Sequence, residues 1–192
     1  MSISKWKKTR SRTDTLLEPS PLVRRFASMI VDATLGKPIL DVACGSGRNA
    51  IFLSRLGCTV ICMDKDLTRL CTEQSRWRRP SFKKASTRLV PHKIDFIKDP
   101  WPFGARAIGG IVNVHFFSPT LFCFFENSLS PGGYLLLETV PGCGENYLEL
   151  PKTGDVRLAL EKGFDFEFYR ERRVGPRDYD AVTVQMLAKR RA

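Results

Sequence analysis

The chain has 192 residues, 43% of them hydrophobic, which is enough for one well-buried domain and short of what two domains normally need. Its formal net charge is +11, with Lys and Arg concentrated in the N-terminal tail, in residues 65–98 and at the C-terminal end. A basic face of this kind either binds phosphates or is a solvated helix surface. The six cysteines form no CxxC pair, which argues against structural zinc and against a disulfide framework.

The distribution of residues along the chain predicts one compact domain that follows a basic N-terminal tail. Residues 1–17 are expected to be a flexible tail, with an organelle-targeting segment as the alternative, and residues 18–192 a single domain. The most apolar stretch, residues 108–125, is interrupted by polar residues and a proline, so we expect no membrane span. The expected protein is cytoplasmic, as a monomer or a homodimer.

Hydrophobic periodicity predicts strands that alternate with helices. The first helix is expected over residues 21–31, where a proline precedes apolar residues at helical spacing. Two strands of opposite direction are expected at the end of the chain, over residues 164–174 and 181–189. Other strands are expected over residues 39–43, 59–63, 88–94, 110–117 and 133–139, and other helices over 49–56, 67–78, 120–128 and 155–161. This order predicts a doubly wound α/β fold, with a mostly parallel sheet covered on both faces and an antiparallel C-terminal hairpin.

A glycine-rich turn, DVACGSG, joins the first strand to the following helix. Glycines let the backbone approach a ligand closely while helix N–H groups face it. Gly45, Gly47 and Ala50 satisfy the loose GxGxx(G/A) spacing of dinucleotide binders, and Asp64 stands where an acid binds ribose hydroxyls. The pattern predicts a nucleoside cofactor. Asp41 would repel a pyrophosphate but attract a sulfonium or ammonium group, which argues against NAD.

The same stretch resembles the cofactor motif of class I S-adenosylmethionine-dependent methyltransferases, in which an acid is followed by C-G-x-G. Asp41, Cys44, Gly45 and Gly47 match that motif. The stretch IDFIKDPWPF resembles the adenine-side loop of the family, and LSPGGYLLLE its turn into the fifth strand. The chain is most similar to the small, single-domain bacterial enzymes of the tellurite-resistance and type 11 groups. This resemblance implies a seven-stranded Rossmann-like sheet.

The resemblance also implies which residues bind S-adenosylmethionine. Gly45 and Gly47 would line its methionine portion, and Asp64 would bind the ribose. Asp95 would bind the adenine amino group, unless it is a helix or turn cap, and Phe96 would lie against the ring. The complete expected set is Asp41, Ala43, Cys44, Gly45, Gly47, Asp64, Lys65, Asp95, Phe96 and Asn113, and no metal ligand is expected.

Methyl transfer from a sulfonium is an in-line displacement, so the enzyme aligns donor and acceptor and, where needed, removes a proton. His115, near the end of the fourth strand, is the candidate base because an imidazole takes up protons near neutrality; the alternative is a structural histidine bonded to a backbone carbonyl. Glu138, Asn146 and Tyr147 are further candidates for acceptor contacts. The fourth strand lacks the Asp/Asn-Pro-Pro-Tyr motif of many amino-group methyltransferases, which makes adenine and glutamine substrates less favoured.

The expected function is methyl transfer from S-adenosylmethionine to a small-molecule acceptor. One alternative is an RNA methyltransferase that holds phosphates with residues 65–98, including Arg76, Arg78 and Arg79. Apart from Trp77, that segment has no aromatic residues interleaved with its basic ones, so nucleic acid is not the favoured partner. A second alternative is a non-catalytic, cofactor-binding partner subunit, and a nicotinamide-dependent dehydrogenase is a more distant one.

Overall fold

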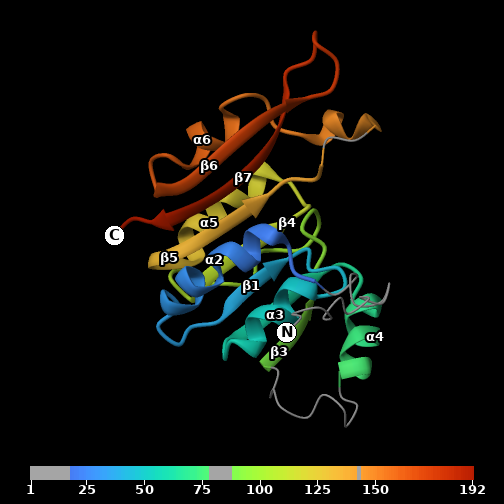
Figure 1. Cartoon of the computed structure of the whole chain (residues 1–192). Helices are drawn as coiled ribbons and strands as arrows, with labels where there is room; N and C mark the ends of the chain where they lie inside the picture. The colour runs from blue at the N-terminus through green and yellow to red at the C-terminus, as the bar shows by residue number, and fades with distance from the viewer. Residues whose placement is uncertain (1–17, 78–87, 142–143) are drawn as a thin grey trace, which may run out of the picture.

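The computed structural model describes residues 18–77, 88–141 and 144–192, and its centre is a sheet of seven strands (Figure 1). The strands are β1 (Ile39–Val42), β2 (Thr59–Asp64), β3 (Arg88–Lys93), β4 (Ile108–Val114), β5 (Leu129–Glu138), β6 (Phe164–Val174) and β7 (Ala181–Arg190). Their order across the sheet is β3-β2-β1-β4-β5-β7-β6. The first five are parallel, whereas β7 runs antiparallel to both of its neighbours. The predicted fold class is therefore confirmed.

Helices connect most of the strands, and all of them except η3 lie where the apolar periodicity predicts a helix. They are α2 (Pro21–Asp32), α3 (Arg48–Arg55), α4 (Thr68–Trp77), η2 (Pro119–Leu121), α5 (Phe122–Ser128), η3 (Gly144–Glu149) and α6 (Asp155–Leu160). The start of α2 has the expected chemistry, because Pro21 occupies its first turn and the Ser20 hydroxyl accepts a 3.1 Å hydrogen bond from the Leu22 N–H. The predicted helix over residues 120–128 is divided into η2 and α5.

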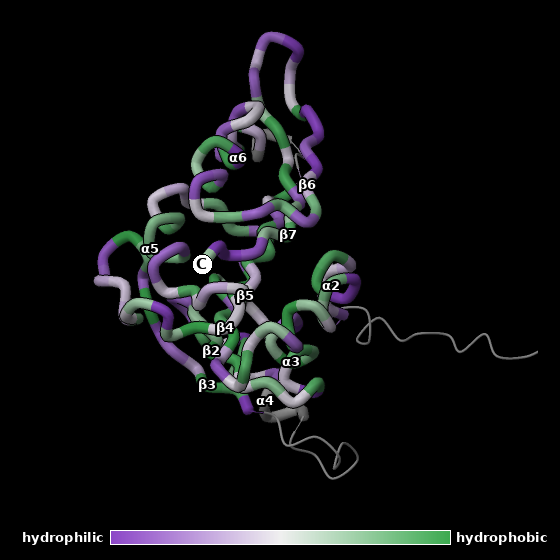
Figure 2. Tube along the Cα trace, turned by 90° about the vertical axis from the view of Figure 1, so that its left-hand side faces the viewer, coloured by the Kyte–Doolittle hydropathy of each residue, from purple (hydrophilic) through white to green (hydrophobic). Residues whose placement is uncertain are grey.

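The sheet separates two apolar clusters, one on each face. Because side chains alternate along a strand, Leu135 and Leu137 of β5 pack toward α5 and α6, whereas Tyr134 and Leu136 pack toward α2 and α3. All seven residues of β4 are buried, as expected for a strand covered on both sides. Figure 2 shows these strands in green at the centre of the molecule, and the tip of the β6–β7 hairpin in purple at the top.

The connection from β3 to β4 contains no helix, and an aromatic loop covers the sheet there instead. Trp101 in this loop packs against the cluster on the α5 side, and its indole N–H donates a 2.7 Å hydrogen bond to the Ser128 hydroxyl. The loop begins beside β3, which is an edge strand. The position of β3 at the edge of the sheet explains why this strand can contain Pro91, because a proline has no N–H to donate to a neighbouring strand.

Two strand boundaries differ from the predicted ones by more than two residues. β4 ends at Val114 instead of residue 117, because His115 has a φ of 62°, a left-handed conformation that ends an extended strand. β5 begins at Leu129 instead of Gly133, because Leu129 pairs with β4 ahead of a shift in register.

Some expectations concern residues outside the described part of the chain. These are the tail of residues 1–17, the basic cluster that includes Arg78 and Arg79, and the side chains of Arg76 and Asn146. Within the described residues, none of the helices combines the length and apolar content needed to span a bilayer.

Candidate cofactor and acceptor site

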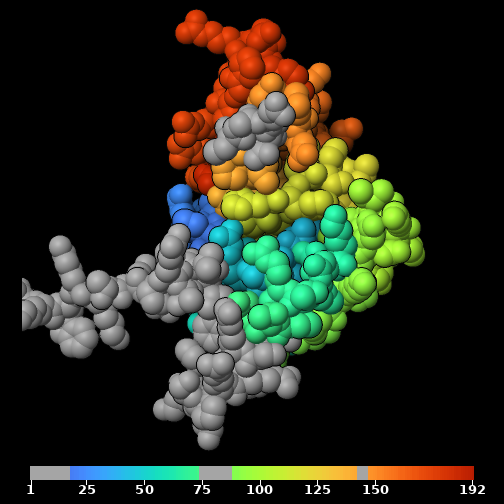
Figure 3. Space-filling model, turned by 90° about the vertical axis from the view of Figure 1, so that its right-hand side faces the viewer, coloured from blue at the N-terminus to red at the C-terminus, as the bar shows by residue number. Residues whose placement is uncertain are grey.

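The carboxyl ends of the parallel strands meet at one edge of the sheet, where the glycine turn also lies. Figure 3 looks onto this edge, toward which the arrows of β1 and β5 point in Figure 1. The chain leaves β1 for β2 on one side, while β4 lies on its other side. Such a reversal of strand order opens the crevice in which doubly wound sheets bind their ligands.

The glycine turn adopts left-handed backbone conformations, with φ angles of 53° at Ala43, 54° at Gly45 and 74° at Gly47. A Cβ atom on Gly47 would lie 2.3 Å from the Leu70 Cδ1, so Gly47 is packed against α4. A Cβ on Gly45 would have no neighbouring atom within 4 Å. The turn is therefore tight on its α4 side and open at Gly45, which leaves room for a ligand. Cys44, which precedes Gly45, is buried.

Asp64 ends β2 directly beside this turn. Its Oδ2 accepts a 2.8 Å hydrogen bond from the Gly45 N–H, and its Oδ1 accepts one of 3.0 Å from the Asp66 N–H. A carboxylate has about four lone-pair sites, so Asp64 can also accept hydrogen bonds from ligand hydroxyls. Lys65, the next residue, is exposed.

Asp41 is buried beneath the first turn of α3, with 1% of its surface exposed. Its Oδ2 accepts a 3.0 Å hydrogen bond from the Ala50 N–H. Burial raises the pKa of Asp41 to about 7; the hydrogen bond from Ala50 and the charge of Arg48 oppose this rise, and the charge of Asp64 adds to it. The carboxyl group thus faces the N-terminus of α3, one turn from the glycines, where a nearby cation would favour its ionised form.

Asn113 is fully buried near the carboxyl end of β4, in register with Val42 of β1 and Leu137 of β5. Neither its amide nitrogen nor its amide oxygen has a hydrogen-bond partner among the described residues. Leaving a buried amide unpaired costs free energy, so a polar ligand that supplies these bonds would bind favourably.

The predicted adenine-side residues follow β3. The Asp95 Oδ1 accepts a 3.0 Å hydrogen bond from the Ile97 N–H, and the carboxylate lies 3.9 Å from the Lys98 ammonium group. Asp95 therefore caps a turn in this structure, as its alternative interpretation expects. The Phe96 ring lies 5.5 Å from that of Phe116, which places this loop beside the end of β4.

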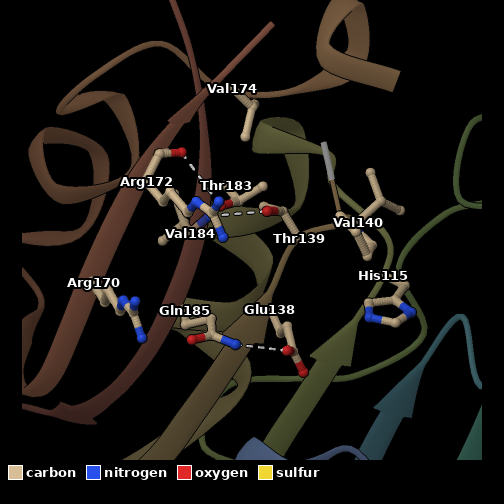
Figure 4. A pocket seen from close by; sticks show the side chains of 11 residues that line it. His115, Glu138, Thr139, Val140, Arg170, Arg172, Val174, Thr183, Val184 and Gln185 are labelled. Carbon is tan, nitrogen blue, oxygen red and sulfur yellow. Dashed lines mark hydrogen bonds between the residues drawn. The ribbon is translucent and has the colours of Figure 1, made fainter. Parts of the chain in front are cut away.

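A cavity of about 410 Å³ adjoins the ends of β4 and β5 and extends along the β6–β7 hairpin (Figure 4). Its polar walls include His115, Glu138, Arg170, Arg172, Thr183 and Gln185. Cross-strand pairing explains why the last four share a face, because Arg170 is opposite Gln185 and Arg172 is opposite Thr183. Sequence reasoning missed these four residues, although the alternation along both strands was visible.

His115 is exposed to this cavity. Neither ring nitrogen has a hydrogen-bond partner among the described residues, so the structural alternative of a bond to a backbone carbonyl is not observed there. Burial lowers the pKa of His115 below its usual range; the positive charge of Arg48 lowers it further, and Glu138 opposes both effects. The imidazole is therefore neutral near pH 7 and able to accept a proton.

The other predicted acceptor contacts lie apart from one another. Glu138 lines the cavity, with its Oε1 accepting a 2.8 Å hydrogen bond from the Gln185 amide. Tyr147 packs at the turn of the hairpin, with its ring 5.1 Å from that of Tyr179. No cluster of three or more potential metal ligands occurs in the part of the chain that the structure describes.

The sequence profile of the family described as tellurite resistance protein TehB matches residues 24–137, which is more than half of the chain. The chain belongs to the TehB family. The match includes the glycine turn, Asp64, Asn113 and His115, and it ends before the β6–β7 hairpin. A comparison with curated proteins found no match.

Solved structures show that this TehB-family chain shares its fold with methyltransferases. A SAM-dependent methyltransferase from Methanosarcina mazei is 15% identical, with a TM-score of 0.63 over 91% of this chain and 99% of that one. TehB from Haemophilus influenzae is 16% identical, with a TM-score of 0.63 over 88% of this chain and 61% of that one. A Burkholderia thailandensis 1,6-didemethyltoxoflavin-N1-methyltransferase, solved with 1,6-didemethyltoxoflavin and S-adenosylhomocysteine bound, is 16% identical, with a TM-score of 0.57 over 94% of this chain and 82% of that one.

The predicted membership of the class I S-adenosylmethionine-dependent methyltransferases, in their tellurite-resistance group, is thus confirmed. S-adenosylmethionine is the cofactor of that class. The hairpin residues that line the cavity lie outside the family match.

Proposed function

We propose that the protein transfers the methyl group of S-adenosylmethionine to a small-molecule acceptor bound in the cavity beside His115. One observation carries this proposal: the glycine turn follows β1, the cavity of about 410 Å³ adjoins the ends of the neighbouring β4 and β5, and His115 lines that cavity. A cavity of this size falls in the range of small-molecule sites.

The residues at this edge fit the proposed cofactor. The open space at Gly45 would take its methionine portion, and the unpaired amide of Asn113 would gain polar partners. Asp64 would accept the ribose hydroxyls. Asp95 and Phe96 would bind the adenine, Asp95 exchanging its turn-capping bond for one with the amino group. The remaining members of the proposed set are Asp41, Ala43, Cys44, Gly47 and Lys65, which border the same turn.

The bound cofactor would supply an electrophilic methyl group on a sulfonium. The protein holds the acceptor in line with that group, and His115 takes the acceptor proton where one must leave. The lowered pKa of His115 keeps the imidazole unprotonated at neutral pH, as a base requires.

In the alternative function, RNA methylation, the basic segment of residues 65–98 would bind the phosphates of the RNA. Residues 78–87 of this segment lie outside the described part of the chain. The cavity volume of about 410 Å³ lies in the range of small-molecule sites, which favours a small acceptor over a duplex. Tritium-labelled S-adenosylmethionine distinguishes the two: we expect label in a small-molecule cell extract and none in bulk cellular RNA. Cofactor binding without transfer to either pool would support a non-catalytic role instead.

Asp64→Ala tests the cofactor site. Loss of the ribose contact should weaken the binding of S-adenosylhomocysteine by about tenfold or more, because charge-assisted hydrogen bonds contribute about 1.5–3 kcal/mol. Isothermal titration calorimetry measures this affinity, and Asp178→Ala, a change at an exposed carboxylate of the hairpin tip, serves as the control. Equal affinities for the wild type and Asp64→Ala would remove Asp64 from the site.

A further inference from the structure

Glu138, the last residue of β5, is held from two sides. The Ser20 hydroxyl donates a hydrogen bond to its Oε2, and the Gln185 amide donates one of 2.8 Å to its Oε1. Ser20 is itself fixed, because it is buried, caps α2 through the Leu22 N–H and donates its own N–H to the Asn49 Oδ1 at 2.9 Å. Two donors on two oxygens suit an ionised carboxylate in a single orientation.

The backbone turn at His115 places the imidazole of this residue on the same side of the sheet as the Glu138 carboxylate. Val114 is paired with Glu138 and packs on the α2 side of the sheet, so in a regular strand the side chain of residue 115 would point to the opposite face. The φ of 62° at His115 breaks that alternation, and its N–H donates a 2.7 Å hydrogen bond to the Glu138 carbonyl. The imidazole consequently lines the same cavity as the Glu138 carboxylate (Figure 4).

Most other charges near this pair are positive. Arg170 and Arg172 line the cavity, and Arg48 acts electrostatically on His115. Among the described residues that line the cavity, Glu138 carries the one carboxylate. An imidazolium formed at His115 would therefore be attracted by Glu138 and repelled by Arg48.

We propose that Glu138 is a positioning residue for His115: its clamped carboxylate stabilises the imidazolium that forms when His115 removes the acceptor proton. This inference rests on the proposed function, in which His115 is the base. The acceptor lone pair forms the new bond to the methyl carbon as the carbon–sulfur bond breaks and leaves its electrons on sulfur. The acceptor proton goes to His115, so the positive charge of the sulfonium passes to the imidazolium beside Glu138.

Titration of the histidine ring signals by NMR tests the electrostatic step without a known acceptor. The chain contains two histidines, so His115 is readily resolved and His92 is an internal reference. We expect Glu138→Gln to lower the pKa of His115 by about half a unit, since removing an opposite charge disfavours the imidazolium, and Glu138→Asp to restore part of it. The matched control is Glu167→Gln, a change at an exposed carboxylate of β6. An unchanged His115 pKa in Glu138→Gln, with the wild-type melting temperature retained, would overturn the proposal.

The pH profile of methyl transfer tests the catalytic consequence. The probe is the initial rate of label transfer from tritiated S-adenosylmethionine to the small-molecule extract. The acid limb of this profile should shift in Glu138→Gln to the same extent as the NMR titration of His115, and Glu167→Gln should leave it in place. A shifted NMR titration with an unshifted acid limb would overturn the role of Glu138 in catalysis. Absence of any transfer by the wild-type protein would instead overturn the proposed function, whatever the NMR result.

Discussion

At the scale of single residues, Asp41 shows how burial makes a carboxyl group sensitive to pH. In the unfolded chain this group ionises around its ordinary pKa of 3.8, whereas in the folded protein it keeps its proton until about pH 7. Below pH 3.8 both states are protonated and Asp41 has no effect on the pH dependence. Between these values the unfolded state alone loses the proton, so the contribution of Asp41 to stability falls as pH rises, by up to about 1.4 kcal/mol per pH unit.

Asp41→Asn should therefore become more stable than the wild type as pH rises, because an amide has no proton to lose and its oxygen can still accept the bond from Ala50. We expect similar free energies of unfolding at pH 4 and a higher value for the variant at pH 8, from urea titrations at both values. Asp178→Asn is the control for a general effect of charge. A variant less stable than the wild type at pH 8 would show that Asp41 is ionised in the folded protein.

At the scale of elements, β4 packs closely against the end of α2. A Cβ atom on Gly109 would lie 2.7 Å from the Thr34 Cα and 2.8 Å from the Thr34 oxygen, both of which are backbone atoms. Backbone atoms cannot move away as the end of a flexible side chain can. The methyl group of an alanine at position 109 would therefore push β4 away from the end of α2.

Gly109→Ala should destabilise the fold by about 1–3 kcal/mol, the usual cost of overpacking. Gly104→Ala is a matched control, because a Cβ there would meet no atom within 4 Å and its φ is not in the left-handed region. Urea denaturation of both variants measures the difference. Equal midpoints would mean that β4 and the end of α2 separate at little cost.

The sequence allowed most of the elements to be predicted, because their apolar periods of 2 and 3.6 are regular and their ends carry proline or glycine. The end of β4 could not be predicted, since the apolar run continues through Phe116 and Phe117 and nothing local requires a turn at His115. The start of β5 depends on pairing of Leu129 with Ile108, a contact set by the sheet and not by the local sequence.

The candidate site also contains residues that could be predicted from the sequence and residues that could not. The glycine turn and Asp64 could be predicted because strand, turn, helix and acid follow each other within a short stretch of sequence. The walls of the cavity at Arg170 and Gln185 could not, because those residues reach Glu138 only through the insertion of β7 between β5 and β6. That insertion is a property of the complete sheet.

At the scale of the whole molecule, we propose that residues 18–192 form the folding unit. A chain that begins at Glu18 should keep the wild-type melting temperature and bind S-adenosylhomocysteine, because it retains Pro19 and Ser20, both buried. A chain that begins at Pro21 is the control: it lacks the helix cap and should lose about 1 kcal/mol of stability. A large drop in melting temperature for the longer of the two chains would show that residues 1–17 contribute to the packed structure.

The place of β7 in the sheet also has a consequence for how the protein is made. In the part of the chain that the structure describes, β6 pairs with β7 alone, and β7 follows the other six strands of the sheet in the sequence. While the ribosome still holds residues 181–190, the nascent chain can assemble the five parallel strands and their glycine turn, but β6 has no neighbour to pair with. The glycine turn can therefore form during translation, whereas the cavity beside His115 is completed only after β7 has left the ribosome.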